Sequence, residues 1–194
     1  MNSQNVLAAD NQQERLIGWI VGFTEGEGCF SIGFIKQPQR NKRKGYQTGI
    51  QVWHEFAITQ GASSVSALEK IKNFFGVGNV YINKRYDNHR EHLYRYVVRK
   101  REDLLNVIIP FFEDNEMHTI KKQQFEKFVQ ILILMKNGKH LSWNGLEEIL
   151  KIVETMNFRK SKESLIRILR DHTPKPMSNQ GKIWSRLHGD MQVQ

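Results

Sequence analysis

The sequence predicts an α+β fold, in which a four-stranded antiparallel sheet carries helices on one of its two faces. The observation that predicts this fold is the order of hydrophobic spacings, which runs helix, two strands, helix, two strands and then further helices. Because the helices of such a fold cover one face of the sheet, its other face stays open. The length of 194 residues suits one ample domain, with two small domains as the alternative.

The first predicted element is a buried helix that begins near Asp10. Asp10 followed by Gln13 resembles a capping box, and the polar residues 1–9 before it are expected to form a flexible lead. Between Arg15 and Glu25 there is no charged residue, and apolar side chains fall on almost all sides of the helix. Several neighbouring elements must therefore bury it, although it is far too short to cross a bilayer.

Two features of this helix indicate contacts beyond its own core. Gly18 and Gly22 lie one turn apart on one face, where a second helix backbone can approach closely. The helix ends in Gly26-Glu27-Gly28, and a carboxylate at a helix C-terminus is unfavourable by about 0.3–1 kcal/mol. We therefore expect a positive group there, and a divalent cation is a good candidate.

The later elements are assigned from spacing and from turn residues. In the fourth strand, Tyr94 and its alternate residues are nearly as apolar as Leu93 and its alternates, so either set can face the core. We expect strands at 30–35, 46–60, 79–85 and 92–100, and helices that follow the capping pair Ser63-Ser64 and lie at 101–112, 119–135, 142–156 and 165–169.

The composition limits the classes of partner and site. Lys and Arg total 29 against 20 acids, which gives a net charge of +9 and favours a polyanion, most commonly nucleic acid, over a basic surface with no partner. Cys29 is the only cysteine, which excludes a disulfide framework and a cysteine zinc site. No phosphate-binding loop of the NTPase type is present, so we expect no small-molecule cofactor. The polar N-terminus lacks an apolar signal core, so we expect an intracellular protein with no membrane partner.

The open face of the sheet is the predicted nucleic-acid surface. Residues 28–54 contain five Lys or Arg residues and no acid. A two-stranded ribbon fits the major groove of DNA, where its outward side chains reach the base edges. A solvated basic face is the alternative, and RNA would use the same charges. The predicted DNA contacts are Ser31, Gly33, Ile35, Gln37, Arg40, Lys42, Arg43, Lys44, Gln51, Trp53, Glu55, Ala57, Tyr81, Asn83, Arg85 and Tyr94.

One stretch makes a family resemblance specific. The residues IVGFTEGEG, at 20–28, resemble the signature of the LAGLIDADG homing endonucleases, in the variant whose last acid is Glu. With the αββαββα order of elements, the resemblance extends from about Arg15 to about Met156. It implies the homing-endonuclease fold with extra C-terminal helices. It also implies an intron- or intein-encoded enzyme that uses magnesium to cut both strands of a long DNA site, leaving 3′ overhangs.

The resemblance also implies roles for the acids of the signature. Glu27 matches the catalytic acid that binds the metal, assisted by the carbonyl of Gly26. Glu25 matches the earlier, usually non-catalytic acid, which we interpret as structural. Hard oxygen ligands favour Mg²⁺ over a soft transition metal, and Mn²⁺ or Ca²⁺ can occupy such a site.

Two further catalytic residues are implied by the same resemblance. Gln60 falls where single-motif members place a polar residue that orders water near the metal. Lys121 matches the lysine proposed to activate water or to stabilise the transition state, with Lys122 as the alternative if the register slips by one. One departure is that residues 61–64 lack the basic side chain that some relatives place shortly after the Gln60 position.

The chain contains one signature, whereas the family brings two signature helices together. We therefore expect a homodimer that acts on a near-palindromic site. The predicted interface residues are Gly18, Val21, Gly22 and Glu25.

These predictions together describe a site-specific DNA endonuclease. The alternative is an RNA maturase or a non-cleaving DNA-binding protein of the same fold. We expect an endonuclease domain over residues 10–157 and a basic extension with a short helix and a tail over 158–194. The expected compartment is an organelle, mitochondrion or chloroplast, or the bacterial cytoplasm.

Overall fold

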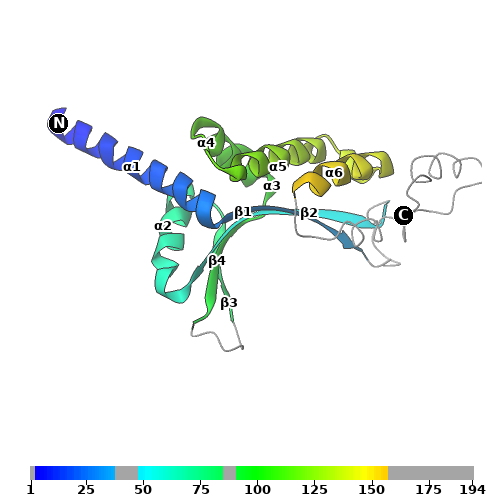
Figure 1. Ribbon diagram of the computed structural model, residues 1–194, viewed down its shortest axis with the longest axis horizontal. Helices are drawn as coiled ribbons and strands as arrows, with labels where there is room; N and C mark the ends of the chain where they lie inside the picture. Colours follow the sequence, from blue (N-terminus) through cyan, green and yellow to red (C-terminus); the bar gives the residue numbers. More distant parts are fainter. Residues whose placement is uncertain (1–2, 38–47, 85–90, 157–194) are drawn as a thin grey trace, which may run out of the picture.

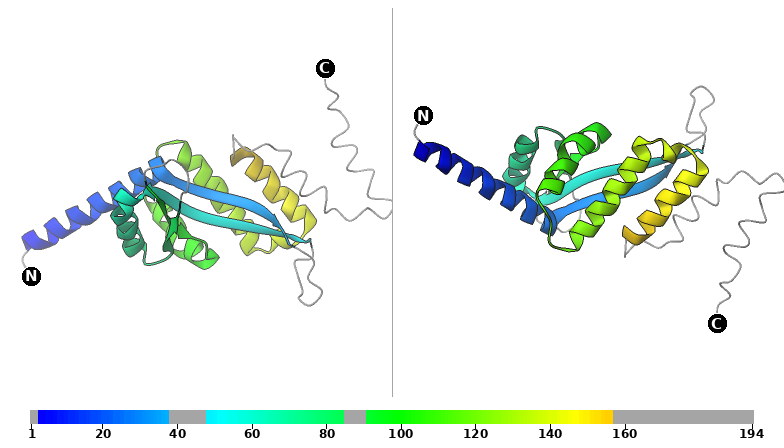
Figure 2. Two further views of the ribbon diagram at one scale, coloured as in Figure 1. Left: turned by 90° about the horizontal axis from the view of Figure 1, so that it is seen from below. Right: turned by 90° about the horizontal axis from the view of Figure 1, so that it is seen from above.

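A computed structural model describes residues 3–37, 48–84 and 91–156. The described elements form a sheet layer and a helix layer, with the first helix projecting beyond the sheet (Figures 1 and 2). Their order confirms the predicted α+β class. In chain order they are α1 (Ser3–Glu27), β1 (Gly28–Lys36), β2 (Ile50–Gly61), η1 (Ala62–Ser64), α2 (Val65–Phe75), β3 (Asn79–Asn83), β4 (Leu93–Val98), α3 (Arg101–Asp103), η2 (Leu104–Ile108), α4 (Ile109–Asp114), α5 (Ile120–Lys136), η3 (Lys139–Leu141) and α6 (Trp143–Met156).

The four strands form one antiparallel sheet in the order β1-β2-β4-β3. Gly28 of β1 pairs with Ile58 of β2, and Ile58 pairs in turn with Tyr96 of β4. Helices α4, α5 and α6 lie on one side of β1 and β2 (Figure 1). The predicted arrangement, with helices on one face of the sheet, is therefore confirmed for the described residues.

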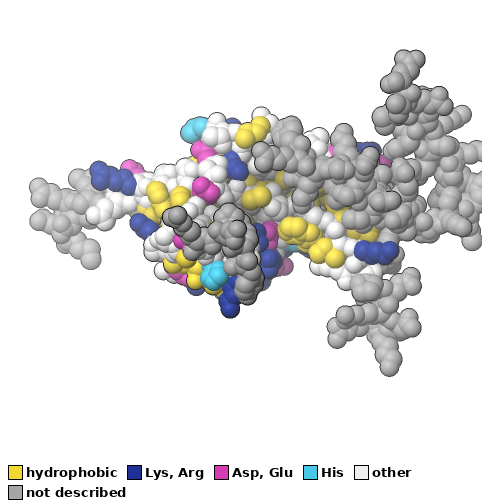
Figure 3. All heavy atoms as spheres, turned by 60° about the horizontal axis from the view of Figure 1, so that its bottom comes forward, with side chains coloured by type: hydrophobic (Ala, Val, Ile, Leu, Met, Phe, Trp, Pro, Cys, Tyr) yellow, Lys and Arg dark blue, Asp and Glu magenta, His cyan; other side chains and the backbone are white. Residues whose placement is uncertain are grey.

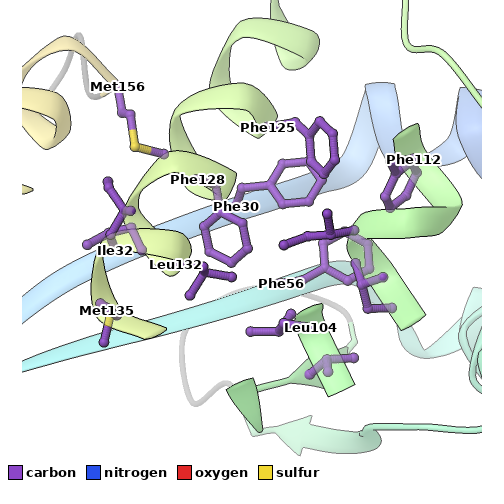
Figure 4. Packing of buried hydrophobic residues seen from close by; sticks show 14 of the residues in the cluster. Phe30, Ile32, Phe56, Leu104, Phe112, Phe125, Phe128, Leu132, Met135 and Met156 are labelled. Atoms are coloured by element: carbon purple, nitrogen blue, oxygen red, sulfur yellow. The ribbon is translucent and has the colours of Figure 1, made fainter. Parts of the chain in front are cut away.

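An aromatic cluster joins the sheet to the helices above it. The ring of Phe30 lies 5.1 Å from Phe56, 5.3 Å from Phe125 and 5.4 Å from Phe128, measured between centroids. These side chains come from β1, β2 and α5 and are at most 6% exposed (Figure 4). Burying one such ring contributes roughly 2–3 kcal/mol, so the cluster fixes α5 over the start of β1.

A half-buried histidine, His54, lies on the helix-covered side of β2. Burial, the Arg101 guanidinium and His140 together lower the pKa of His54 to about 4. Neither ring nitrogen of His54 has a hydrogen-bond partner within the described residues. The imidazole is therefore neutral in the native protein at pH 7.

Three sequence-based predictions about the elements need correction. α1 begins at Ser3 and not at Asp10, so the proposed capping box lies inside the helix. The predicted helix 101–112 contains a π-helical turn over Leu104–Ile108, directly before α4, whose second residue is Pro110. The pairing of β4 with β2 places Tyr94 and Tyr96 on the helix-covered face, where Tyr94 packs against the core. The placement of Tyr94 among the DNA contacts is therefore wrong.

Candidate metal and DNA site

The signature acids lie where α1 passes directly into β1 without a loop. Glu27 is the last residue of α1, and its side chain is exposed. Within the described residues the Glu27 side chain makes no hydrogen bond or ion pair. A Cβ at Gly28 would lie 2.6 Å from the Thr24 carbonyl oxygen, so the tight turn into the strand requires glycine there. The junction thus presents an unpaired carboxylate on a rigid support.

Glu25 is bound inside its own chain. Its Oε1 accepts hydrogen bonds from the backbone N–H groups of His118 and Thr119, each at 2.6 Å. Burial raises the pKa of the Glu25 carboxyl, but the backbone and side-chain hydrogen bonds from Thr119 and the backbone hydrogen bond from His118 outweigh it and leave the pKa below 4.5. The carboxylate therefore ties the end of α1 to the beginning of α5, which supports the structural role predicted for it.

Lys121 reaches the same junction from the first turn of α5. Thr119 caps this helix by accepting from the backbone N–H of Lys121 at 3.2 Å. The Lys121 ammonium donates to the carbonyl oxygen of Gly28 at 2.6 Å, next to Glu27 in the chain. Lys122 instead pairs with Glu116. The geometry therefore selects Lys121 over Lys122 as the basic residue at the junction.

Gln60 lies at the same end of the sheet. It is the penultimate residue of β2, two positions beyond Ile58, which pairs with Gly28 at the start of β1. The structure thus brings Lys121 of α5 to the α1–β1 junction that carries Glu27, and it places Gln60 at the end of β2 nearest that junction. The space beside Gly61 contains Glu91, whose carboxylate accepts from the N–H of Ser63 at 2.9 Å. An acid therefore stands near the position where some relatives have a base.

The α1–β1 junction offers suitable ligands for a hard metal ion, but it does not form a complete metal site by itself. Glu27 offers an unpaired carboxylate, and carboxylate and carbonyl oxygens are the ligands that Mg²⁺ and Ca²⁺ prefer. No group of three or more His, Cys, Asp or Glu residues that could hold a metal occurs in the described part of the chain. The junction therefore supplies one protein carboxylate, and other ligands have to come from DNA, water or a second domain.

The family follows from sequence comparison. The sequence pattern of the LAGLIDADG endonucleases matches residues 20–132, more than half of the chain. The chain belongs to this family.

Named relatives of this LAGLIDADG chain include both longer proteins and solved structures. The chain is 28% identical over 138 residues to the probable intron-encoded endonuclease 2 of Neurospora crassa, which covers 71% of this chain but 26% of that protein. The homing endonuclease I-TnaI is 36% identical with a TM-score of 0.67, covering 80% of this chain and 96% of that one. I-SmaMI bound to uncleaved DNA in the presence of calcium ions is 30% identical with a TM-score of 0.65, covering 82% and 51%. The chain thus spans about a quarter of the N. crassa relative and about half of I-SmaMI.

The open face of the LAGLIDADG sheet shows most of the predicted polar contacts at its surface. Trp53 of β2 lies across Gly33 of β1, where an added Cβ would come within 2.1 Å of the indole Nε1. Gln37 and Gln51 hydrogen bond to each other beside Ile35, which is exposed. Tyr81 and Asn83 are exposed on β3, and dark blue Lys and Arg side chains lie around the β3–β4 end (Figure 3). Arg40, Lys42, Arg43, Lys44 and Arg85 lie outside the described residues.

Two predicted contacts on this face are buried, and two arginines were missed. Ala57 is 2% exposed, so its prediction as a DNA contact is wrong. Glu55 is 4% exposed and pairs with Arg95 and Arg99 of its own chain. The sequence placed these arginines among the basic residues of the third and fourth strands, but not among the predicted DNA contacts, because it could not decide which face of β4 looks outward. The pairing of Thr59 with Arg95 on the open face was the missing signal.

The glycine face of α1 is open. A Cβ at Gly18, Gly22 or Gly26 would meet no other described atom within 4 Å. Val21, by contrast, is buried in the core of its own chain, and Glu25 is bound to α5. The prediction of an interface role is therefore wrong for Val21 and unsupported for Glu25.

None of the described helices is long and apolar enough to span a membrane.

Proposed function

We propose that this chain is a site-specific homing endonuclease that cuts both strands of a long, near-palindromic DNA target by magnesium-dependent phosphodiester hydrolysis. The observation that carries the proposal is the exposed, unpaired carboxylate of Glu27 beside the Lys121 ammonium at the α1–β1 junction. A protein that only binds DNA has no need of an unpaired acid at the edge of a basic surface.

The chemistry assigns a distinct task to each residue. Glu27, with the carbonyl of Gly26, would hold Mg²⁺, which when bound activates water and neutralises charge on the phosphate. Lys121 has its ammonium held at the Gly28 carbonyl, where its charge offsets that of the phosphate or of the leaving oxygen. Gln60 offers both a donor and an acceptor for orienting a water molecule.

A complete site requires a second Glu27, because one carboxylate per chain is a poor metal cage. We propose that a second copy of the chain supplies it by packing against the open Gly18 and Gly22 face of α1. Analytical ultracentrifugation tests the stoichiometry. Two chains per complex with DNA are expected, and a single chain on cleaved DNA would refute the homodimer.

The nuclease proposal is tested with DNA selected by the protein itself. The full-length Glu27→Gln variant is used to enrich bound duplexes from a randomised library. Wild type with Mg²⁺ should cut the enriched duplex on both strands, and Glu27→Gln should bind it without cutting. If wild type leaves this tightly bound duplex uncut, the protein is a DNA-binding protein. If RNA is enriched instead, the maturase alternative is supported. We propose that the enzyme acts where its target DNA resides, in an organelle or in a bacterial cytoplasm.

A further inference from the structure

A buried carboxylate lies on the open, basic face of the sheet. Glu55 of β2 pairs across the sheet with Ser31 of β1, on the side opposite the core residue Phe56. Although this side carries no helix among the described elements, Glu55 is 4% exposed. A carboxylate is buried at such a place only if its charge is compensated by partners.

Arg95 of the neighbouring strand β4 and Arg99, which directly follows the end of β4, supply that compensation. Arg95 donates from Nη2 to Oε1 of Glu55 at 2.6 Å, and Arg99 donates from Nε to Oε2 at 3.0 Å. Each carboxylate oxygen is thus engaged by a different guanidinium. The arginine side chains remain 33% and 60% exposed, so they cover Glu55 while facing away from the core.

The atoms used by Arg99 determine what it can still bind. Its Nε is committed to Glu55, and no other hydrogen bond to Arg99 is present in the described part of the chain. Its two terminal nitrogens therefore remain as a planar pair of donors. The guanidinium also lies over the ring of Tyr81, 6.0 Å from the centroid, which further limits its rotation. Contacts with Glu55 and Tyr81 therefore hold the Arg99 guanidinium in one orientation before any ligand binds.

A planar pair of donors on the proposed DNA-binding face matches two kinds of acceptor pair. One is O6 and N7 of guanine in the major groove, and the other is a phosphate group. A phosphate contact depends mainly on positive charge, and a neighbouring carboxylate would weaken it. A base contact depends on the direction of the fork, which is what Glu55 and Tyr81 fix.

We propose that Arg99 reads a guanine in the target and that Glu55 is the positioning residue that aims it. This inference rests on the proposed DNA-binding function. It predicts one position in each half of the target where G is required. Arg95 is half-buried and donates to Glu55 through a terminal nitrogen, so it also helps to neutralise the Glu55 carboxylate.

The test compares base preferences and not only affinities. Full-length wild type, Glu55→Gln, Arg99→Lys and the control Glu69→Gln are each used to enrich a randomised duplex library with Ca²⁺ present. The control removes one partner of the ion pair between Glu69 and Lys72 on α2, away from the sheet face. Thermal unfolding of each variant shows whether the folded state is retained, and Arg99→Lys keeps the test valid if Glu55→Gln does not fold.

The expected result is a local change in specificity. Wild type and Glu69→Gln should require G at the same position, whereas Arg99→Lys should lose about tenfold or more of that discrimination with other positions unchanged. Glu55→Gln should lose discrimination at the same position while retaining overall affinity within a few-fold.

Other outcomes overturn the inference. If the variants keep the base preference of wild type, and Arg99→Lys or Glu55→Gln only weakens binding to all sequences, then Arg99 contacts phosphate or the cluster is structural. A failure of the proposed function looks different, because wild type itself would then enrich no DNA sequence.

Discussion

Replacing Glu25 should destabilise the fold, whereas the same replacement of its neighbour Glu27 should not. Both carboxylates lie in the last turn of α1, where they face the negative end of the helix dipole. Only Glu25 is compensated, because its Oε1 accepts from the N–H groups of His118 and Thr119 at 2.6 Å. The two acids therefore form a matched pair for measuring what the tie between α1 and α5 contributes.

The expected change in the free energy of unfolding follows from the contacts of each carboxylate. A hydrogen bond to a charged group contributes roughly 1.5–3 kcal/mol, and the partial exposure of Glu25 reduces this to about 1 kcal/mol for each of the two bonds from backbone N–H groups. Removing either acid relieves about 0.5 kcal/mol of repulsion from the dipole. Glu25→Ala should therefore lose about 1.5 kcal/mol and Glu27→Ala should gain about 0.5 kcal/mol, a difference of about 2 kcal/mol.

The assay is urea unfolding at pH 7, followed by far-UV circular dichroism, with thermal unfolding as a second measurement. For a chain of this size about 2 kcal/mol corresponds to a difference of roughly 4–8 °C in Tm. The hydrogen bonds keep the folded pKa of Glu25 below its ordinary value of 4.5. Its contribution is therefore present above that value and is lost as the pH falls through the folded pKa, so wild type and Glu25→Ala should converge in acid.

Equal free energies of unfolding for Glu25→Ala and Glu27→Ala at pH 7 would refute this reasoning. They would mean that packing alone holds the beginning of α5, and that the two hydrogen bonds contribute nothing beyond those made to water.

Three further predictions follow from single side chains. Burial holds the pKa of His54 near 4, so its contribution to stability is present above its ordinary pKa of 6.5 and is lost as the pH falls toward 4. Urea titrations should show wild type losing about 1 kcal/mol more than His54→Gln between pH 7 and 5, allowing for partial exposure, and parallel pH profiles would contradict this. Lys121→Met should slow cleavage by about 10²-fold with little change in DNA affinity, while Lys122→Met should not, and equal rates would remove Lys121 from the reaction. Tyr96→Phe should lose about 1 kcal/mol, because the buried hydroxyl donates to a backbone carbonyl at 2.8 Å, and exposed Tyr81→Phe should lose almost none of its stability.

The sequence allowed the elements and the motif acid to be predicted because these depend on local spacing. Alternating apolar residues identified β1 and β2, and the Gly-Glu-Gly string located Glu27 at a helix end. The fourth strand shows where this method fails. Leu93 to Val98 alternate equally well in both senses, so only pairing with β2 assigns Tyr94 to the core side and Arg95 to the open side.

The alternation of apolar and polar residues along a strand also could not predict which side chains are exposed to solvent. Ala57 alternates with core residues and so lies on the open face, but its methyl side chain is shorter than its neighbours and is buried. Glu55 has the same orientation, and its burial depends on Arg95 of β4 and on Arg99, which follows β4. Alternation gives the face on which a side chain lies and not its accessibility.

The sequence by itself determined that an apolar helix delivers Glu27 to the edge of a basic antiparallel sheet. The expected burial of this helix on several sides is wrong within the described residues, where Trp19 is 36% exposed and the face of Gly18 and Gly22 is open. The tertiary structure decided which distant residues meet it there. Lys121 reaches Gly28 across 93 positions, and Arg95 reaches Glu55 across 40. The physical reason is that hydrophobic periodicity and capping act within a few residues of the chain. Contacts between distant residues depend instead on strand register and helix packing, which the whole core sets together.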